Sequence, residues 1–138
     1  MQQTAILLPV MSLVGWTSLT LLLVPYQRFK AAFAGQVKVE DFKLGESGNV
    51  PAHVSIPNRN YINLLEAPVL YYVVCICYFI TESVGALAVA LAWGYVGLRV
   101  LQSLVHLSYN NVFHRLAIFA SSNLVLVALW LLLLPHLI

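Results

Sequence analysis

Charged side chains are scarce in this sequence, and their scarcity excludes an ordinary soluble domain. Only 9% of the 138 residues are charged, whereas 61% are hydrophobic. Soluble globular domains average roughly 25% charged and 45–50% apolar residues. The formal net charge of +2 is also too small to indicate a protein that binds nucleic acid. The composition therefore predicts a membrane protein, and the length fits a single domain over residues 1–138.

Cysteines and histidines are too few and too dispersed to predict a metal site. Cys75 and Cys77 are separated by one residue in an apolar run, which places them on different sides of a helix, and we interpret them as packing residues. His106 and His114 are eight positions apart, too far for a shared metal or haem on one helix. The N-terminus shows no basic region and no signal-peptide cleavage site, so its apolar run is expected to remain as a membrane helix.

What the sequence does contain is a set of long apolar runs. A helix needs about 20 apolar residues to cross the hydrocarbon of a bilayer. Spanning segments of this kind must be helical, because open strands would leave backbone groups without hydrogen bonds in lipid. The sequence thus predicts an all-α integral membrane protein, a bundle of four transmembrane helices. They are expected at about residues 5–24 (stopping at Pro25), 61–80, 84–107 and 116–134.

The connections between the predicted spans differ in length and in charge. A polar loop of about residues 28–58 follows the first span, whereas the other two connections are short turns. The segment from Arg28 to Arg59 holds five of the seven basic residues, and Arg115 lies at the turn on the same side. The positive-inside rule places this side in the cytoplasm. Both termini are then expected to face away from the cytoplasm.

Two ionisable residues are predicted to lie at the same depth in the bilayer. Glu66 precedes the far end of the second span, and Arg99 follows the far end of the third, by about 14 and 15 residues. At about 1.5 Å per helical residue, both lie roughly 21–22 Å from the far interface. Burying either charge alone would cost about 2.5–3.5 kcal/mol. We therefore expect Glu66 and Arg99 to meet, directly or through a ligand.

Further polar residues lie on the same helix faces as Glu66 and Arg99. Spacings of three and four place them on one helix face in each span. Arg115 begins the fourth span at the same mouth. Because arginine binds carboxylates in a bidentate manner, this set favours a pocket for an anionic ligand that carries carboxylates. The residues are Arg59, Asn63 and Glu66 on the second span, and Arg99, Gln102 or Ser103, His106 and Asn110 on the third.

Two motifs in these segments resemble the MAPEG family, the membrane-associated proteins of eicosanoid and glutathione metabolism. The stretch RNYINLLE, residues 59–66, has the pattern R-x-x-x-N-x-x-E and is followed closely by Pro68. The stretch RVLQSLVHLSYNNVFHR, residues 99–115, is similar to the third motif of the family, which opens and closes on arginine. The resemblance covers essentially the whole chain and is closest to bacterial members.

The resemblance implies a homotrimer in the bacterial inner membrane, with glutathione as co-substrate at the cytoplasmic side between adjacent subunits. Its partners would be further copies of the chain, membrane lipids and a lipophilic small molecule. It also implies roles for particular residues. Glutathione would contact Arg59, Asn63, Glu66, Arg99, Arg28 and Tyr109, and Arg115 with His106 would stabilise the thiolate.

One position departs from the pattern and leaves alternatives open. His106 stands where many glutathione-using members carry a tyrosine, and Tyr109 lies one turn away. The first hypothesis is a glutathione transferase or glutathione-dependent peroxidase acting on lipophilic electrophiles. The second is a non-enzymatic ligand-binding or regulatory membrane protein on the same scaffold. The third is a small proton-coupled transporter that uses Glu66, which the polar loop and the number of arginines disfavour.

Overall fold

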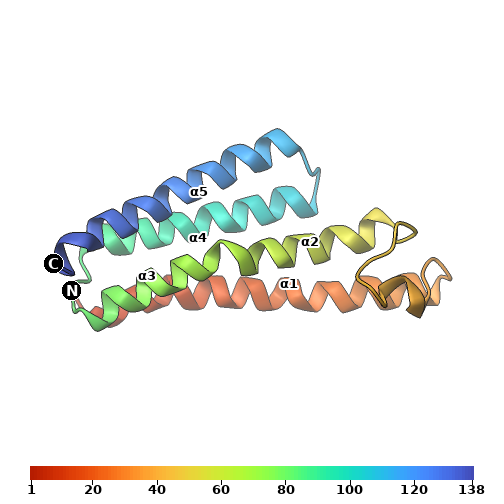
Figure 1. Cartoon of the computed structure of the whole chain (residues 1–138), viewed down its shortest axis with the longest axis horizontal. Helices are drawn as coiled ribbons and strands as arrows, with labels where there is room; N and C mark the ends of the chain where they lie inside the picture. The colour runs from red at the N-terminus through yellow and green to blue at the C-terminus, as the bar shows by residue number, and fades with distance from the viewer.

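A computed structural model describes all of residues 1–138, and it is helical throughout (Figure 1). Four helical stretches are long and apolar enough to cross a membrane, so the chain is an integral membrane protein with the predicted four-helix architecture. The second span is divided into two helices. The helices are α1 (Leu7–Phe33), α2 (Ala52–Glu66), α3 (Pro68–Ile80), α4 (Ala86–Leu107) and α5 (Val112–Leu133), with short 3-10 turns at Gln3–Ile6, Val39–Phe42 and Leu134–His136.

The expectation that the first span stops at Pro25 is wrong, because α1 continues through this proline to Phe33. Proline is tolerated inside membrane helices, where neighbouring groups compensate for the lost backbone hydrogen bond. The extension is also held by packing, since Ala31 is buried against Val37 and Val54 of the following segments. Part of the predicted polar loop is thus helix.

The second span begins earlier than expected, at Ala52 instead of near Tyr61. Its first turns are polar, which hides them from a hydropathy reading, yet Val54 and Pro57 pack inward there. The irregular connection therefore shortens to residues 34–51. Within it, the carboxylate of Asp41 accepts hydrogen bonds from the Lys38 amide and the Ser47 hydroxyl, both at 2.8 Å. These donors lower the pKa of Asp41.

The fourth span also begins earlier than expected, at Val112 instead of Leu116. The side chain of Asn111 caps it by accepting a hydrogen bond from the His114 amide at 3.1 Å. The third span differs less, because α4 starts at Ala86. Figure 1 shows α4 lying between α2 and α5. Residues of α2, α4 and α5 can therefore meet at the end of the bundle that carries the basic loop.

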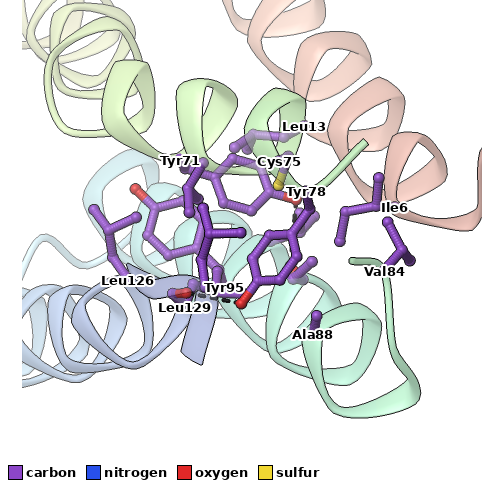
Figure 2. Close-up of a cluster of buried hydrophobic side chains, with 14 of the residues drawn as sticks. Ile6, Leu13, Tyr71, Cys75, Tyr78, Val84, Ala88, Tyr95, Leu126 and Leu129 are labelled. Atoms are coloured by element: carbon purple, nitrogen blue, oxygen red, sulfur yellow. Dashed lines mark hydrogen bonds between the residues drawn. The ribbon is translucent and has the colours of Figure 1, made fainter. Parts of the chain in front are cut away.

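The core of the bundle is built around buried tyrosines (Figure 2). The rings of Tyr71 on α3 and Tyr95 on α4 stack with centroids 4.4 Å apart. The hydroxyl of Tyr78 donates to the Leu129 carbonyl on α5 at 2.8 Å, whereas that of Tyr71 donates to the Ala92 carbonyl at 3.4 Å. These contacts join three helices in the half of the bundle away from the basic loop.

The lengths of these two hydrogen bonds lead to a stability prediction. Tyr78→Phe should lower the free energy of unfolding by about 0.6–1.7 kcal/mol, from the average to the maximum measured for hydrogen bonds within a membrane bundle. Tyr71→Phe, which removes the longer bond, serves as the matched control and should cost less. Unfolding in mixed micelles monitored by circular dichroism measures both. Equal losses would show that the shorter Tyr78 bond contributes no more than the longer Tyr71 bond.

The predicted topology can be checked on sealed vesicles. Single cysteines at Gln2 and at Leu44, in a background without Cys75 and Cys77, should react with a membrane-impermeant maleimide from opposite sides. Leu44 is 96% exposed, so a cysteine there is reachable. If both sites label from one side, α1 does not cross the membrane.

Candidate functional site

A pocket of about 230 Å³ lies between α2, α4 and α5 near the basic end of the bundle. Its polar lining comes from one residue on each helix, Asn63, Gln102 and Arg115. Its apolar lining comes from α5 alone and consists of Val112, Leu116 and Phe119. Two of the predicted site residues, Asn63 and Arg115, thus meet across helices that are far apart in the sequence. The mixture suits a ligand with a polar end and an apolar contact surface.

Arg115 reaches this pocket from the first turn of α5, and its side chain is held in place. Its Nη1 donates to the Asn110 side-chain oxygen at 2.8 Å. Asn110 has a positive φ of 50°, a conformation that asparagine tolerates better than most residues. The tight turn between α4 and α5 therefore orients the guanidinium. Arg115 is half-buried, so its charge acts in a partly water-excluded setting.

Arg99 lies deeper, directly behind the pocket, and is only 1% exposed. Its Nη1 donates to Oε1 of Gln102, and its Nη2 donates to the backbone carbonyl of Asn63, both at 2.6 Å. The guanidinium also lies 5.6 Å from the ring centroid of Phe119, a cation–π contact. Arg99 thereby contacts one residue on each of the three helices that line the pocket, namely Asn63, Gln102 and Phe119.

The direct pair between Glu66 and Arg99 that the sequence predicts is not formed. The ion pair in this structure is a different one, between Arg28 and Glu46. Glu66 is exposed on α2, whereas Arg99 is buried and donates to a backbone carbonyl and to a side-chain amide oxygen. The matched depth is nevertheless present, because Arg99 bonds to Asn63, one turn from Glu66. A contact bridged by a ligand stays a prediction.

Arg59 and Glu66 are exposed on the α2 face that carries Asn63, outside the pocket lining. His106 is buried, at 3% exposed, and does not line the pocket. The positive charges that act on it are those of Arg115 and Arg59. The structure therefore gathers these predicted residues around the pocket without placing them in one continuous lining.

Two predicted residues lie elsewhere. The hydroxyl of Tyr109 makes a 2.8 Å hydrogen bond with Nδ1 of His114, and the Tyr109 side chain is exposed. Arg28 pairs with Glu46 at 3.4 Å and stacks over Phe42 at 4.7 Å. It lines a separate pocket of about 260 Å³ beside the 34–51 connection. Within one protomer, neither residue contributes to the pocket of Arg115.

The comparison with protein families matches the model of the MAPEG family to residues 6–135. The chain belongs to the MAPEG family. The match covers nearly the whole protein and includes both motifs. No curated protein and no solved structure matches the chain. Family membership agrees with the four membrane-spanning helices of the structure, and this MAPEG chain carries the family's architecture.

The sequence reading of this MAPEG protein missed Phe119 as a site residue. A signal for it was present, since Phe119 follows Arg115 by four positions and therefore shares its helix face. Gln102 was one of two alternatives for its position on α4, the other being Ser103. The structure selects Gln102 for the pocket and buries Ser103 at 2% exposed.

Proposed function

We propose that this MAPEG protein uses glutathione to conjugate lipophilic electrophiles or to reduce lipophilic hydroperoxides. The observation that carries the proposal is the pocket in which Asn63, from the first family motif, meets Arg115, from the second. Glutathione has two carboxylates, an ammonium group and a thiol, and these match the available arginines, amides and Glu66 in charge and hydrogen bonding.

In this proposal the exposed residues at the mouth bind the charged ends of glutathione. Arg59 pairs with a carboxylate, and Glu66 accepts from the ammonium group. Asn63 and Gln102 donate to backbone oxygens of the tripeptide. Arg28 would join these contacts once subunits assemble, and Arg99 would support them from behind the pocket. The sulfur then lies near Arg115, with His106 one layer deeper.

The chemistry at the sulfur follows from the charge of Arg115. A guanidinium beside a thiol favours the thiolate, which is the nucleophile. In conjugation, the thiolate forms a bond to an electrophilic carbon. In a substitution, the bond from that carbon to the leaving group breaks and its electron pair departs with the group; in an addition, a π bond breaks and the resulting anion takes up a proton. In peroxide reduction, two glutathione molecules become one disulfide while a hydroperoxide becomes an alcohol and water. The apolar wall formed by Val112, Leu116 and Phe119 would receive the lipophilic partner from the bilayer.

The proposed assembly is a homotrimer in a bacterial inner membrane, with both termini away from the cytoplasm. Several observations support an assembly in which subunits complete each other's site. The pocket has a volume of about 230 Å³, which is below the roughly 300–1,000 Å³ that is usual for ligand pockets. Arg59 and Glu66 are exposed on the α2 face that carries Asn63, and Tyr109 is exposed on the turn between α4 and α5, so all three are accessible to a neighbouring copy. Membrane lipids would cover the remaining apolar surface.

A second function is favoured by one specific observation, the lack of a hydroxyl at the pocket. Tyr109 is engaged with His114, and the buried His106 occupies the usual tyrosine position. A non-enzymatic protein that binds glutathione or another anion, without activating a thiol, would have this arrangement. A proton-coupled transporter is less favoured, because the long polar connection after α1 and the number of arginines do not suit a small transporter that works through one carboxylate.

Calorimetry with glutathione on the full chain in lipid nanodiscs tests binding directly. Arg59→Ala should weaken binding roughly tenfold or more, because a charge-assisted hydrogen bond contributes about 1.5–3 kcal/mol. Lys43→Ala is the matched control, since Lys43 is an exposed cation on the connection after α1 and should leave affinity unchanged. Equal affinity in both variants would remove Arg59 from the site. No binding by the unmodified protein would reject glutathione as the ligand.

A further inference from the structure

The break between α2 and α3 leaves a set of backbone acceptors open. Pro68 has no amide hydrogen, so it cannot donate to the carbonyl of Leu64, and its ring crowds that carbonyl. α2 accordingly ends at Glu66, and α3 begins at Pro68. The last four carbonyls of a helix have no partner within it. Asn63 carries the first of these four carbonyls.

Such a carbonyl in the membrane is costly unless a donor from elsewhere reaches it. Here the donor is Nη2 of Arg99 on α4, at 2.6 Å. The same guanidinium donates through Nη1 to Oε1 of Gln102, also at 2.6 Å. The fork geometry of arginine allows both bonds at once, which a lysine ammonium cannot reproduce.

The bond to Gln102 has a consequence for the pocket. An amide side chain has an acceptor oxygen and a donor nitrogen, and either could face a ligand. Because Arg99 has no acceptor, its donor can only be matched by the oxygen of Gln102. The nitrogen of Gln102 is then the group left for the pocket, which Gln102 lines together with Arg115. The pocket therefore presents donors, and it favours an anion or a carbonyl-rich ligand.

We propose that Arg99 is a positioning residue that does not touch the ligand: it ties the carbonyl released at the Pro68 break to Gln102 and so fixes the amide of Gln102 with its donor toward the pocket. Its burial, at 1% exposed, supports a role behind the pocket wall. The proposal deepens the function proposed above and rests on it for the identity of the ligand, but the clamp itself can be tested without any ligand.

The ligand-free test observes the Asn63 carbonyl by nuclear magnetic resonance. The chain has only two Asn–Leu pairs, Asn63–Leu64 and Asn123–Leu124. Labelling asparagine at the carbonyl carbon with ¹³C and leucine with ¹⁵N should therefore give two peaks in an HNCO spectrum of the full chain in nanodiscs. Arg99→Met should move the Asn63 carbonyl resonance upfield and leave that of Asn123 in place. An unchanged Asn63 resonance would overturn the clamp.

The ligand-dependent test is a double-mutant cycle on glutathione affinity. Arg99→Met and Gln102→Met should each weaken binding roughly tenfold, and the double variant should be no weaker than Gln102→Met alone. Additive losses would mean that Arg99 contacts the ligand itself. Arg99→Lys keeps a cation at this depth with a single donor group, so it should fold and still lose affinity. If it binds as tightly as the unmodified protein, the orientation of Gln102 does not depend on the guanidinium fork.

The two tests keep the clamp and the proposed function apart. If the unmodified protein does not bind glutathione while Arg99→Met moves the Asn63 resonance, the clamp stands and the ligand assignment fails. If glutathione binds and the resonance does not move, the function stands and the clamp is rejected.

Discussion

Replacing Arg115 with alanine should raise the pH at which bound glutathione becomes a thiolate, by roughly one to two pH units. The guanidinium is half-buried at the pocket and is fixed by its 2.8 Å bond to Asn110, so its field acts on one place. In a partly water-excluded site, such a charge is screened less than on an open surface. Losing it removes the largest stabilisation available to a thiolate there.

A pH titration of the complex, followed by the ultraviolet absorbance of the thiolate, measures this effect. Arg115→Lys keeps the charge and should retain most of the shift, whereas Lys43→Ala removes a distant cation and should retain all of it. Turnover with a model electrophile should fall in parallel in the alanine variant. If the unmodified protein binds glutathione but shows no thiolate below the pH of the free tripeptide, the enzyme hypothesis fails and the binding-protein alternative replaces it.

The four spans were predictable from the sequence because lipid leaves few choices. An apolar run of about 20 residues can satisfy its backbone only as a helix, so length and hydropathy decide the architecture. The ends of these helices were less predictable, because the constraint that lipid imposes stops at the edge of the hydrocarbon. The first turns of α2 and the end of α1 lie where water or headgroups replace hydrocarbon, and packing at Ala31 and Val54 determines the helix there. Hydropathy does not register that packing.

The depth of the site in the bundle and the helices that form it were predictable, but the hydrogen-bond partners of its residues were not. Helical rise placed Glu66 and Arg99 at one depth, and the structure keeps that level through the Asn63 carbonyl. The spacing of residues in a sequence indicates only which side chains can meet, so it favoured the carboxylate of Glu66 as the partner of Arg99. The acceptor that Arg99 reaches is the backbone carbonyl of Asn63 in the last turn of α2, and only the geometry of the α2–α3 break brings it into reach.

The turn between α4 and α5 limited the prediction in a similar way. Spacing alone placed Tyr109 one turn beyond His106 and left open whether its hydroxyl could replace the missing tyrosine. The backbone at Asn110 has a positive φ, and the chain reverses there. Within the protomer, Tyr109 therefore reaches His114 on α5 and not the pocket. Such a reversal depends on dihedral angles that residue spacing does not encode.

The buried position of Arg99 leads to the second large effect, on stability. Arg99→Met leaves the Asn63 carbonyl and the Gln102 oxygen without their donor, and should lower the free energy of unfolding by about 2–4 kcal/mol. Gln102→Met should cost about 1.5–3 kcal/mol, because it deprives a buried cation of one acceptor. The Nε of Arg99 already has no hydrogen-bond partner, so losing the Gln102 oxygen leaves this buried cation with only the Asn63 carbonyl as an acceptor.

Glu66→Gln is the matched control for these two variants. Glu66 is exposed and forms no ion pair within the protomer, so the change should stay within about 0.5 kcal/mol. The double variant of Arg99→Met and Gln102→Met should lose less than the sum of the single losses, because each change removes the same bond. Reversible unfolding in mixed micelles, followed by tryptophan fluorescence, gives all four free energies. A large loss of stability in Glu66→Gln that is coupled to the loss in Arg99→Met would instead support the direct ion pair between Glu66 and Arg99. Strict additivity of the Arg99→Met and Gln102→Met losses would show that the bond between these two side chains does not stabilise the bundle.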